Sequence, residues 1–184
     1  MRISAQQQVI NKYEATSKDV QEYFGELPDL LELENWEIAL AYTFMLLERG
    51  YNRVLYCGVV KLHCAHKDVA QSIIDKQQIT RKNYPELYEN VMGHSIPPEL
   101  LSELKAAERV RDRVVHGKKV ERGDMRKAII GILDYAEKTN EIIAKTDKSL
   151  RPFRRSLVGF KGTAQPLDKK TTSWLLKGLG FQVG

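Results

Sequence analysis

The spacing of apolar residues along the chain predicts a protein made of α-helices. Apolar side chains recur every three or four residues, as on one face of a helix, and no useful stretch shows the alternation of a strand. We therefore expect an all-α fold, a bundle of five or six helices. The predicted helices cover residues 4–24, 36–49, 52–76, 84–92, 97–116 and 125–145.

Residues that commonly begin or end helices set these boundaries. Gly25, Gly50 and Gly117 each follow a periodic segment, where glycine often ends a helix in a left-handed conformation. Asn35 and Asp124 precede periodic segments and are expected to cap the helices that follow them.

Two segments depart from ordinary amphipathic spacing. Residues 26–35 are rich in acidic side chains and are expected to form a connector with at most one helical turn. Residues 54–64 are apolar nearly all round, which is typical of a helix at the centre of a bundle or pressed against another subunit.

Composition places the chain among globular proteins. Of its 184 residues, 42% are apolar and 29% are charged, and no apolar run is long enough to cross a membrane. The N-terminus lacks the apolar region of a secretory signal, so we expect a cytoplasmic protein. Cys57 and Cys64 are expected to fill the core as free thiols. His63 and His66 lie nearby, but the four residues lack a recognised zinc spacing, so no metal site is predicted.

The net charge of +5 is concentrated at the C-terminal end of the sequence. Residues 145–184 hold nine Lys or Arg and two Asp, so their net charge is +7 and that of residues 1–144 is −2. We expect a basic C-terminal extension, residues 148–184, that drapes over the helices or folds on a partner. Its basic and aromatic residues suit an RNA groove and an acidic protein equally well. Its expected anchors are Phe160, Trp174, Leu175 and Phe181.

The densest cluster of reactive side chains ends the helix predicted over residues 97–116. Residues 109–117 contain three Arg, one Asp and one His. Asp112 and His116 are four residues apart and share a helix face. Arg111 lies five residues before His116, roughly 140° around an ideal helix. The two meet only if the helix unwinds near its end or a second copy of the chain completes the site.

These residue types suit chemistry at a phosphodiester. A histidine poised near neutrality can transfer protons, and here the helix C-terminus and Asp112 favour its protonated form while the arginines oppose it. An arginine can bind a phosphate through two parallel hydrogen bonds and stabilise developing charge. Without any metal, this combination fits RNA cleavage through attack by the ribose 2′-OH. A plainer interpretation stays open, because a histidine before glycine at a basic helix end also fits ordinary capping.

The motif Arg111-Asp112-x-x-x-His116 resembles the signature of the HEPN superfamily: Arg, a polar residue, three further residues and His. The context is similar, because the motif closes one helix and a long amphipathic helix follows it. The resemblance covers roughly residues 35–145 and implies a small all-α domain over residues 1–147. Many members are metal-independent ribonucleases of toxin–antitoxin, phage-defence and RNA-processing systems. They typically dimerise and bring two copies of the motif together.

The resemblance also assigns roles to individual residues. Arg111 and His116 would be catalytic, and Asp112 would be the supporting polar residue. Basic residues beside the motif would contact RNA phosphates. These are Arg109, Arg113, Lys118, Lys119 and Arg122.

We therefore expect a metal-independent endoribonuclease without a cofactor, belonging to a toxin or defence system. Its expected partners are RNA, a second copy of the chain and, for a toxin, a neutralising antitoxin protein. The alternative is a non-catalytic HEPN-like scaffold that binds RNA or a protein partner. A DNA-binding helical regulator is a weaker alternative, because the sequence shows no tight helix–turn–helix spacing.

Overall fold

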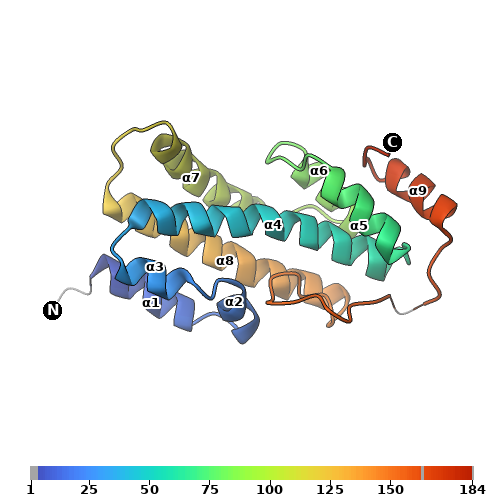
Figure 1. Cartoon of the computed structure of the whole chain (residues 1–184), viewed down its shortest axis with the longest axis horizontal. Helices are drawn as coiled ribbons and strands as arrows, with labels where there is room; N and C mark the ends of the chain where they lie inside the picture. The colour runs from blue at the N-terminus through green and yellow to red at the C-terminus, as the bar shows by residue number, and fades with distance from the viewer. Residues whose placement is uncertain (1–3, 163, 184) are drawn as a thin grey trace. The chain divides into compact units, whose positions relative to one another are not determined.

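The computed structural model describes residues 4–162 and 164–183, and this part of the chain is all-helical, as predicted (Figure 1). It contains nine α-helices and no β-strand among the described residues, so the predicted number of five or six helices is not confirmed. The helices are α1 (Ala5–Glu14), α2 (Lys18–Tyr23), α3 (Leu27–Glu32), α4 (Trp36–Leu62), α5 (Lys67–Lys76), α6 (Tyr84–Met92), α7 (Pro98–Val115), α8 (Arg122–Thr146) and α9 (Lys169–Gly178).

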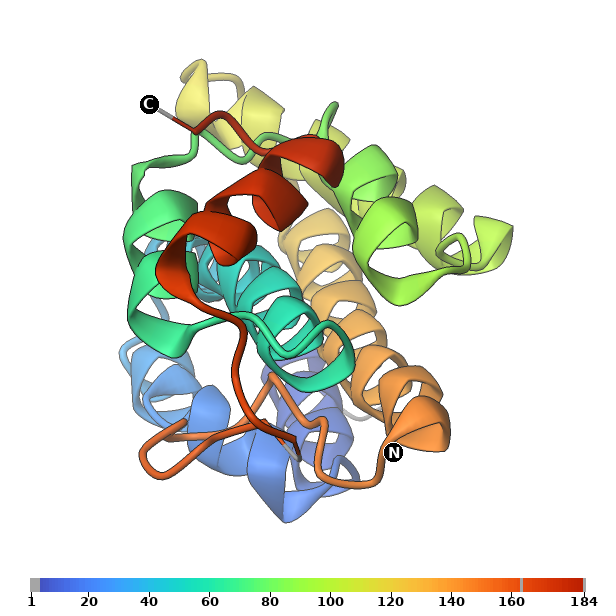
Figure 2. The same ribbon diagram turned by 90° about the vertical axis from the view of Figure 1, so that its right-hand side faces the viewer.

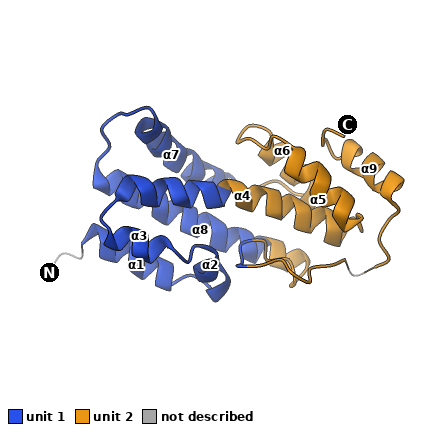
Figure 3. Ribbon diagram, viewed as in Figure 1, with its two compact units in different colours: residues 1–47, 97–142, 153–155 blue, residues 48–96, 143–152, 156–184 orange. Residues whose placement is uncertain are grey.

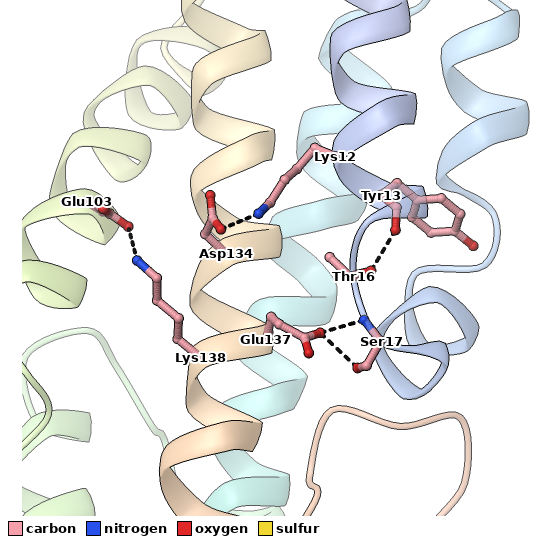
Figure 4. A network of polar contacts seen from close by, with 8 residues as sticks. All are labelled: Lys12, Tyr13, Thr16, Ser17, Glu103, Asp134, Glu137 and Lys138. Atoms are coloured by element: carbon pink, nitrogen blue, oxygen red, sulfur yellow. Dashed lines mark hydrogen bonds and ion pairs between the residues drawn. The ribbon is translucent and has the colours of Figure 1, made fainter.

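The first predicted helix, over residues 4–24, is two helices in the structure. Ser17 lies at the break, where its backbone N–H and its hydroxyl both donate to Oε2 of Glu137 on α8, at 2.9 and 2.8 Å (Figure 4). The hydroxyl of Thr16 donates to the carbonyl oxygen of Tyr13 at 2.7 Å. Such side-chain bonds offer the backbone an alternative to the helical ladder, and periodicity alone does not reveal them.

The predicted helix end at Gly50 is also wrong, because α4 continues through this residue to Leu62. Gly50 is buried, and its neighbours Leu47 and Tyr51 are 1% and 2% exposed, so the apolar face continues across it. The break comes at Cys64 instead, which adopts a left-handed conformation with φ +55°. A left-handed conformation is uncommon for cysteine, so this helix end could not be predicted from the residue type.

The remaining helices agree more closely with the predictions. α6 has the predicted bounds, and α7 differs by one residue at each end. The acidic connector contains the short helix α3, which buries Leu27 and Leu31. Asp124 lies in the first turn of α8, so its predicted role as the cap is wrong.

The structure divides into two compact units (Figure 3). Residues of α4 and α8 belong to both units. The expected boundary between residues 147 and 148 remains a prediction, and the C-terminal segment contributes to both units. Unit 1 comprises residues 1–47, 97–142 and 153–155, and unit 2 comprises residues 48–96, 143–152 and 156–184.

The core of unit 1 is built around aromatic side chains from distant parts of the sequence. The ring of Phe153 is fully buried and meets the rings of Tyr23 and Tyr135 edge to face, at centroid distances of 5.4 and 6.3 Å. The buried amide of Asn140 donates to the carbonyl of Phe153 at 2.8 Å and accepts from its N–H at 3.0 Å. Phe153 lies outside any helix, so these two bonds supply the partners that its buried backbone N–H and C=O groups need.

The core of unit 2 joins α4, α5, α6 and α9. The rings of Tyr51 and Tyr84 stack at 3.9 Å, and both are buried. The apolar segment of residues 54–64 is largely buried within this unit, which favours its interpretation as a central helix over a subunit contact. None of the helices in the described part of the chain has the length and apolar character needed to cross a membrane.

α9 forms part of unit 2 and lies beside α5 in both views (Figures 1 and 2). Its buried residue Thr172 accepts a hydrogen bond from the backbone N–H of His66 at 2.9 Å. Phe181 is buried as expected, but Trp174 is 64% exposed and is not an anchor.

Candidate functional site

The candidate site starts from the C-terminal end of α7, which closes as predicted. Gly117 has φ +66°, and its N–H donates to the carbonyl of Val114 at 2.9 Å. The N–H of Lys118 donates to the carbonyl of Arg113 at 2.9 Å. This pair of bonds is the Schellman pattern, which satisfies the last carbonyls of a helix. It makes His116 the cap residue, and its side chain is exposed.

Arg111 is held on the inner side of the same helix. Its Nη1 lies 3.1 Å from Oδ1 of Asp112, and its guanidinium carbon lies 5.4 Å from the ring centroid of Phe44 on α4. The side chain of Arg111 is 24% exposed. A guanidinium over an aromatic face and beside a carboxylate keeps its charge at a fixed place, where it can meet an anion.

Asp112 connects the two other motif residues. Its carboxylate pairs with Arg111, and its backbone carbonyl accepts from the N–H of His116 at 3.0 Å. The structure places the carboxylate of Asp112 against Arg111, and the supporting role expected for this residue stays a prediction.

The basic residues expected to contact RNA have different surroundings. Arg109, Lys118 and Lys119 are exposed. Nη2 of Arg113 donates to the carbonyl of Lys119 at 3.0 Å, so this arginine braces the loop after α7. Nη2 of Arg122 lies 3.4 Å from Oε2 of Glu34, and both side chains are more than 60% exposed. An exposed pair of this kind contributes little to stability and can open to another anion.

Two hollows of unit 1 lie near α7 and the start of α8. One, of about 510 Å³, lies between α7 and α8 and is lined in part by Ala106, Val110 and Lys127. The other, of about 400 Å³, is lined by Glu34, Arg122 and their neighbours. Neither hollow is lined by Arg111 or His116. The motif residues therefore lie outside the lining of both hollows.

Sequence reasoning missed Phe44, whose ring lies under the motif arginine from another helix. Phe44 is 4% exposed and falls at the edge of the apolar stripe of α4. Its contact with Arg111 depends on how α4 and α7 pair, which no spacing within either helix reveals.

Comparison with models of protein families, with curated proteins and with solved structures finds no match. The HEPN resemblance therefore rests on the motif residues and on their place at the end of α7. Within residues 4–162 and 164–183, no three His, Cys, Asp or Glu side chains are grouped so as to hold a metal ion.

Proposed function

We propose that this protein is a metal-independent endoribonuclease of the HEPN type, acting in the cytoplasm as part of a toxin or defence system. The observation that carries the proposal is one helix end, where an exposed imidazole at the cap follows a guanidinium that is fixed by Asp112 and Phe44. Proton transfer and charge stabilisation are the two tasks that RNA cleavage by an internal nucleophile requires.

In the proposed reaction the ribose 2′-oxygen forms a bond to phosphorus and the bond to the 5′-oxygen breaks. His116 accepts the proton of the 2′-OH or donates a proton to the leaving 5′-oxygen. Arg111 binds a non-bridging phosphate oxygen and stabilises the added negative charge of the transition state. The products carry a 2′,3′-cyclic phosphate and a 5′-OH.

The active unit that we propose is a homodimer. Arg111 faces α4, whereas His116 is exposed at the helix end, as the angle of roughly 140° between them on a helix predicts. A phosphate bound by Arg111 of one subunit can then meet His116 of the other. The basic residues around the motif, from Arg109 to Arg122, would contact the flanking phosphates.

Two single substitutions test the proposal on an RNA substrate in the presence of a chelator. His116→Ala should lower the cleavage rate about 100-fold or more, because general acid–base catalysis contributes about 10²–10⁴-fold. Arg111→Ala should lower it about as much, since it removes a donor to the transition-state charge. His94→Ala, at a loop histidine of unit 2, is the matched control. The helical circular dichroism signal should stay unchanged, and undiminished cleavage by both variants would contradict the proposal.

One observation favours the scaffold alternative. Nη1 of Arg111 already donates a hydrogen bond to the carboxylate of Asp112, so a phosphate has to compete with this carboxylate for the guanidinium. A scaffold would bind RNA with a steep dependence on salt and leave the RNA intact. Incubation of the purified protein with total RNA, with and without chelator, separates the two functions.

A further inference from the structure

The outer face of α9 carries a tryptophan between two lysines. Thr172 and Leu176 are fully buried and form the inner face of this helix. Lys170, Trp174 and Lys177 are spaced by four and three residues, so they share the opposite, exposed face. Asp168 caps the start of this helix, because its carboxylate accepts hydrogen bonds from Thr171 and from backbone amides. The same hydrogen bonds keep the pKa of Asp168 below its usual range.

The indole of Trp174 is accessible and has a cation over it. Its side chain is 64% exposed, and Nζ of Lys170 lies 4.9 Å from the centre of its ring. An exposed aromatic ring can stack against another planar ring. The other tryptophan, Trp36, is only 5% exposed and belongs to unit 1.

A groove of unit 2 opens beside this face, between α5 and α9. It has a volume of about 740 Å³ and is lined by two lysines, Lys76 and Lys169, against one carboxylate, Asp68. Ser173 also lines it, whereas Trp174, the next residue, does not. An elongated anion that lies in the groove therefore reaches the indole only by continuing around α9 to its outer face.

We propose that Lys76, Lys169, Lys170, Trp174 and Lys177 form a surface that binds single-stranded RNA, here called the α9 surface. One unpaired base stacks on Trp174, and the lysines contact the phosphates on either side of it. Stacking on exposed aromatic rings and a basic groove are the two features by which proteins hold single strands. The inference goes beyond the cleavage site on α7 and rests on the proposed function only in the choice of RNA.

The exposed apolar area argues against a membrane as the partner. A helix that lies on a bilayer presents a broad apolar face. On α9, Leu176 is fully buried and Leu175 is partly buried, which leaves Trp174 as the large apolar side chain that is exposed on this helix. One ring flanked by lysines suits a base and its phosphates better than a lipid surface.

Intrinsic fluorescence tests the α9 surface directly. In the variant Trp36→Phe/His116→Ala the indole of residue 174 is the single tryptophan, and the RNA is not cut if the proposed function holds. Addition of a short oligouridylate, which has no secondary structure, should quench this emission to a plateau. Vesicles of anionic phospholipid should leave it unchanged. Quenching by the vesicles but not by the oligouridylate would overturn the proposal.

A substitution series measured by anisotropy of labelled oligouridylate needs no change at the buried Trp36. Trp174→Ala should weaken binding about tenfold, or about 1.4 kcal/mol, because it removes the stacking of one base. Trp174→Phe should retain most of the affinity, whereas Trp174→Leu should lose it, because stacking needs a ring. Equal affinity of the Leu and Phe variants would contradict the stacking role.

The lysines have their own readout in the salt dependence. Lys170→Gln/Lys177→Gln should reduce the slope of log affinity against log salt concentration by about 1.4, the value for two phosphate contacts on a single strand. Lys82→Gln/Lys148→Gln, at exposed lysines of unit 2 outside the α9 surface, is the matched control and should leave the slope unchanged. Equal slopes for the two double variants would overturn the proposal.

Binding without cleavage by the unmodified chain would leave this inference intact and contradict only the proposed function.

Discussion

Single residues decide how the motif is presented. Arg111 and His116 are recognisable in the sequence because their types and spacing are unusual. The contacts of Arg111 and of the flanking residue Arg122 are less predictable, since Phe44 reaches Arg111 from another helix at 5.4 Å and Glu34 pairs with Arg122 from a left-handed backbone with φ +53°. Both contacts depend on tertiary structure. The sequence therefore predicted the motif residues but not the partners that hold them.

Gly117 and Gly131 form a matched pair of glycines for testing the helix end. An added Cβ would meet no atom within 4 Å at either position, so neither change causes a clash, and of the two only Gly117 has a left-handed φ. Gly117→Ala should lower the free energy of unfolding by about 1–2 kcal/mol, because its left-handed φ of +66° disfavours a Cβ. Gly131→Ala, inside α8, should raise it by about 0.5–1 kcal/mol. Urea denaturation measures both, and shifts of the same sign would contradict this account.

At the scale of helices, periodicity predicted the regular parts of the fold and failed at interruptions. The long faces of α6, α7 and α8 were readable because their apolar residues repeat without a break. The interruption at Ser17 depends on Glu137, a residue 120 positions away, and the continuity through Gly50 depends on burial. Neither depends on local sequence. The predicted number of five or six helices is not confirmed, because the first predicted helix is divided at Ser17 and because α3 and α9 form two further helices.

The contact between α4 and α6 depends on the absence of a side chain at Gly58. A Cβ here would lie 2.4 Å from Cγ1 of Val91 and 3.1 Å from Sδ of Met92. Gly58→Ala should therefore destabilise the fold by about 1–3 kcal/mol through overpacking. The double variant Gly58→Ala/Val91→Ala should cost less than the sum of the two single changes, because the shorter side chain makes room. Thermal unfolding of the three variants tests this, and additive losses would exclude the steric cause.

At the scale of the whole molecule, the proposed dimer leads to a complementation experiment. Arg111→Ala and His116→Ala chains should each be inactive, and their mixture should regain about a quarter of the normal activity. About half of randomly assorted dimers are mixed, and each has one intact site if the two residues come from different subunits. RNA cleavage after joint refolding is the measurement. An inactive mixture would mean that both residues act within one subunit.

Residues 153–155 have a practical consequence for anyone who shortens this protein. Because the C-terminal segment is positively charged, truncation near residue 147 looks like a natural choice. However, Phe153 lies in the core of unit 1, and its backbone N–H and C=O groups are hydrogen-bonded to Asn140. A chain that ends there would have a cavity beside Tyr23 in the core. It would also leave the buried side-chain amide of Asn140 without its hydrogen-bond partners. Instability of such a fragment would then result from the loss of Phe153 and would not reveal what the removed segment does.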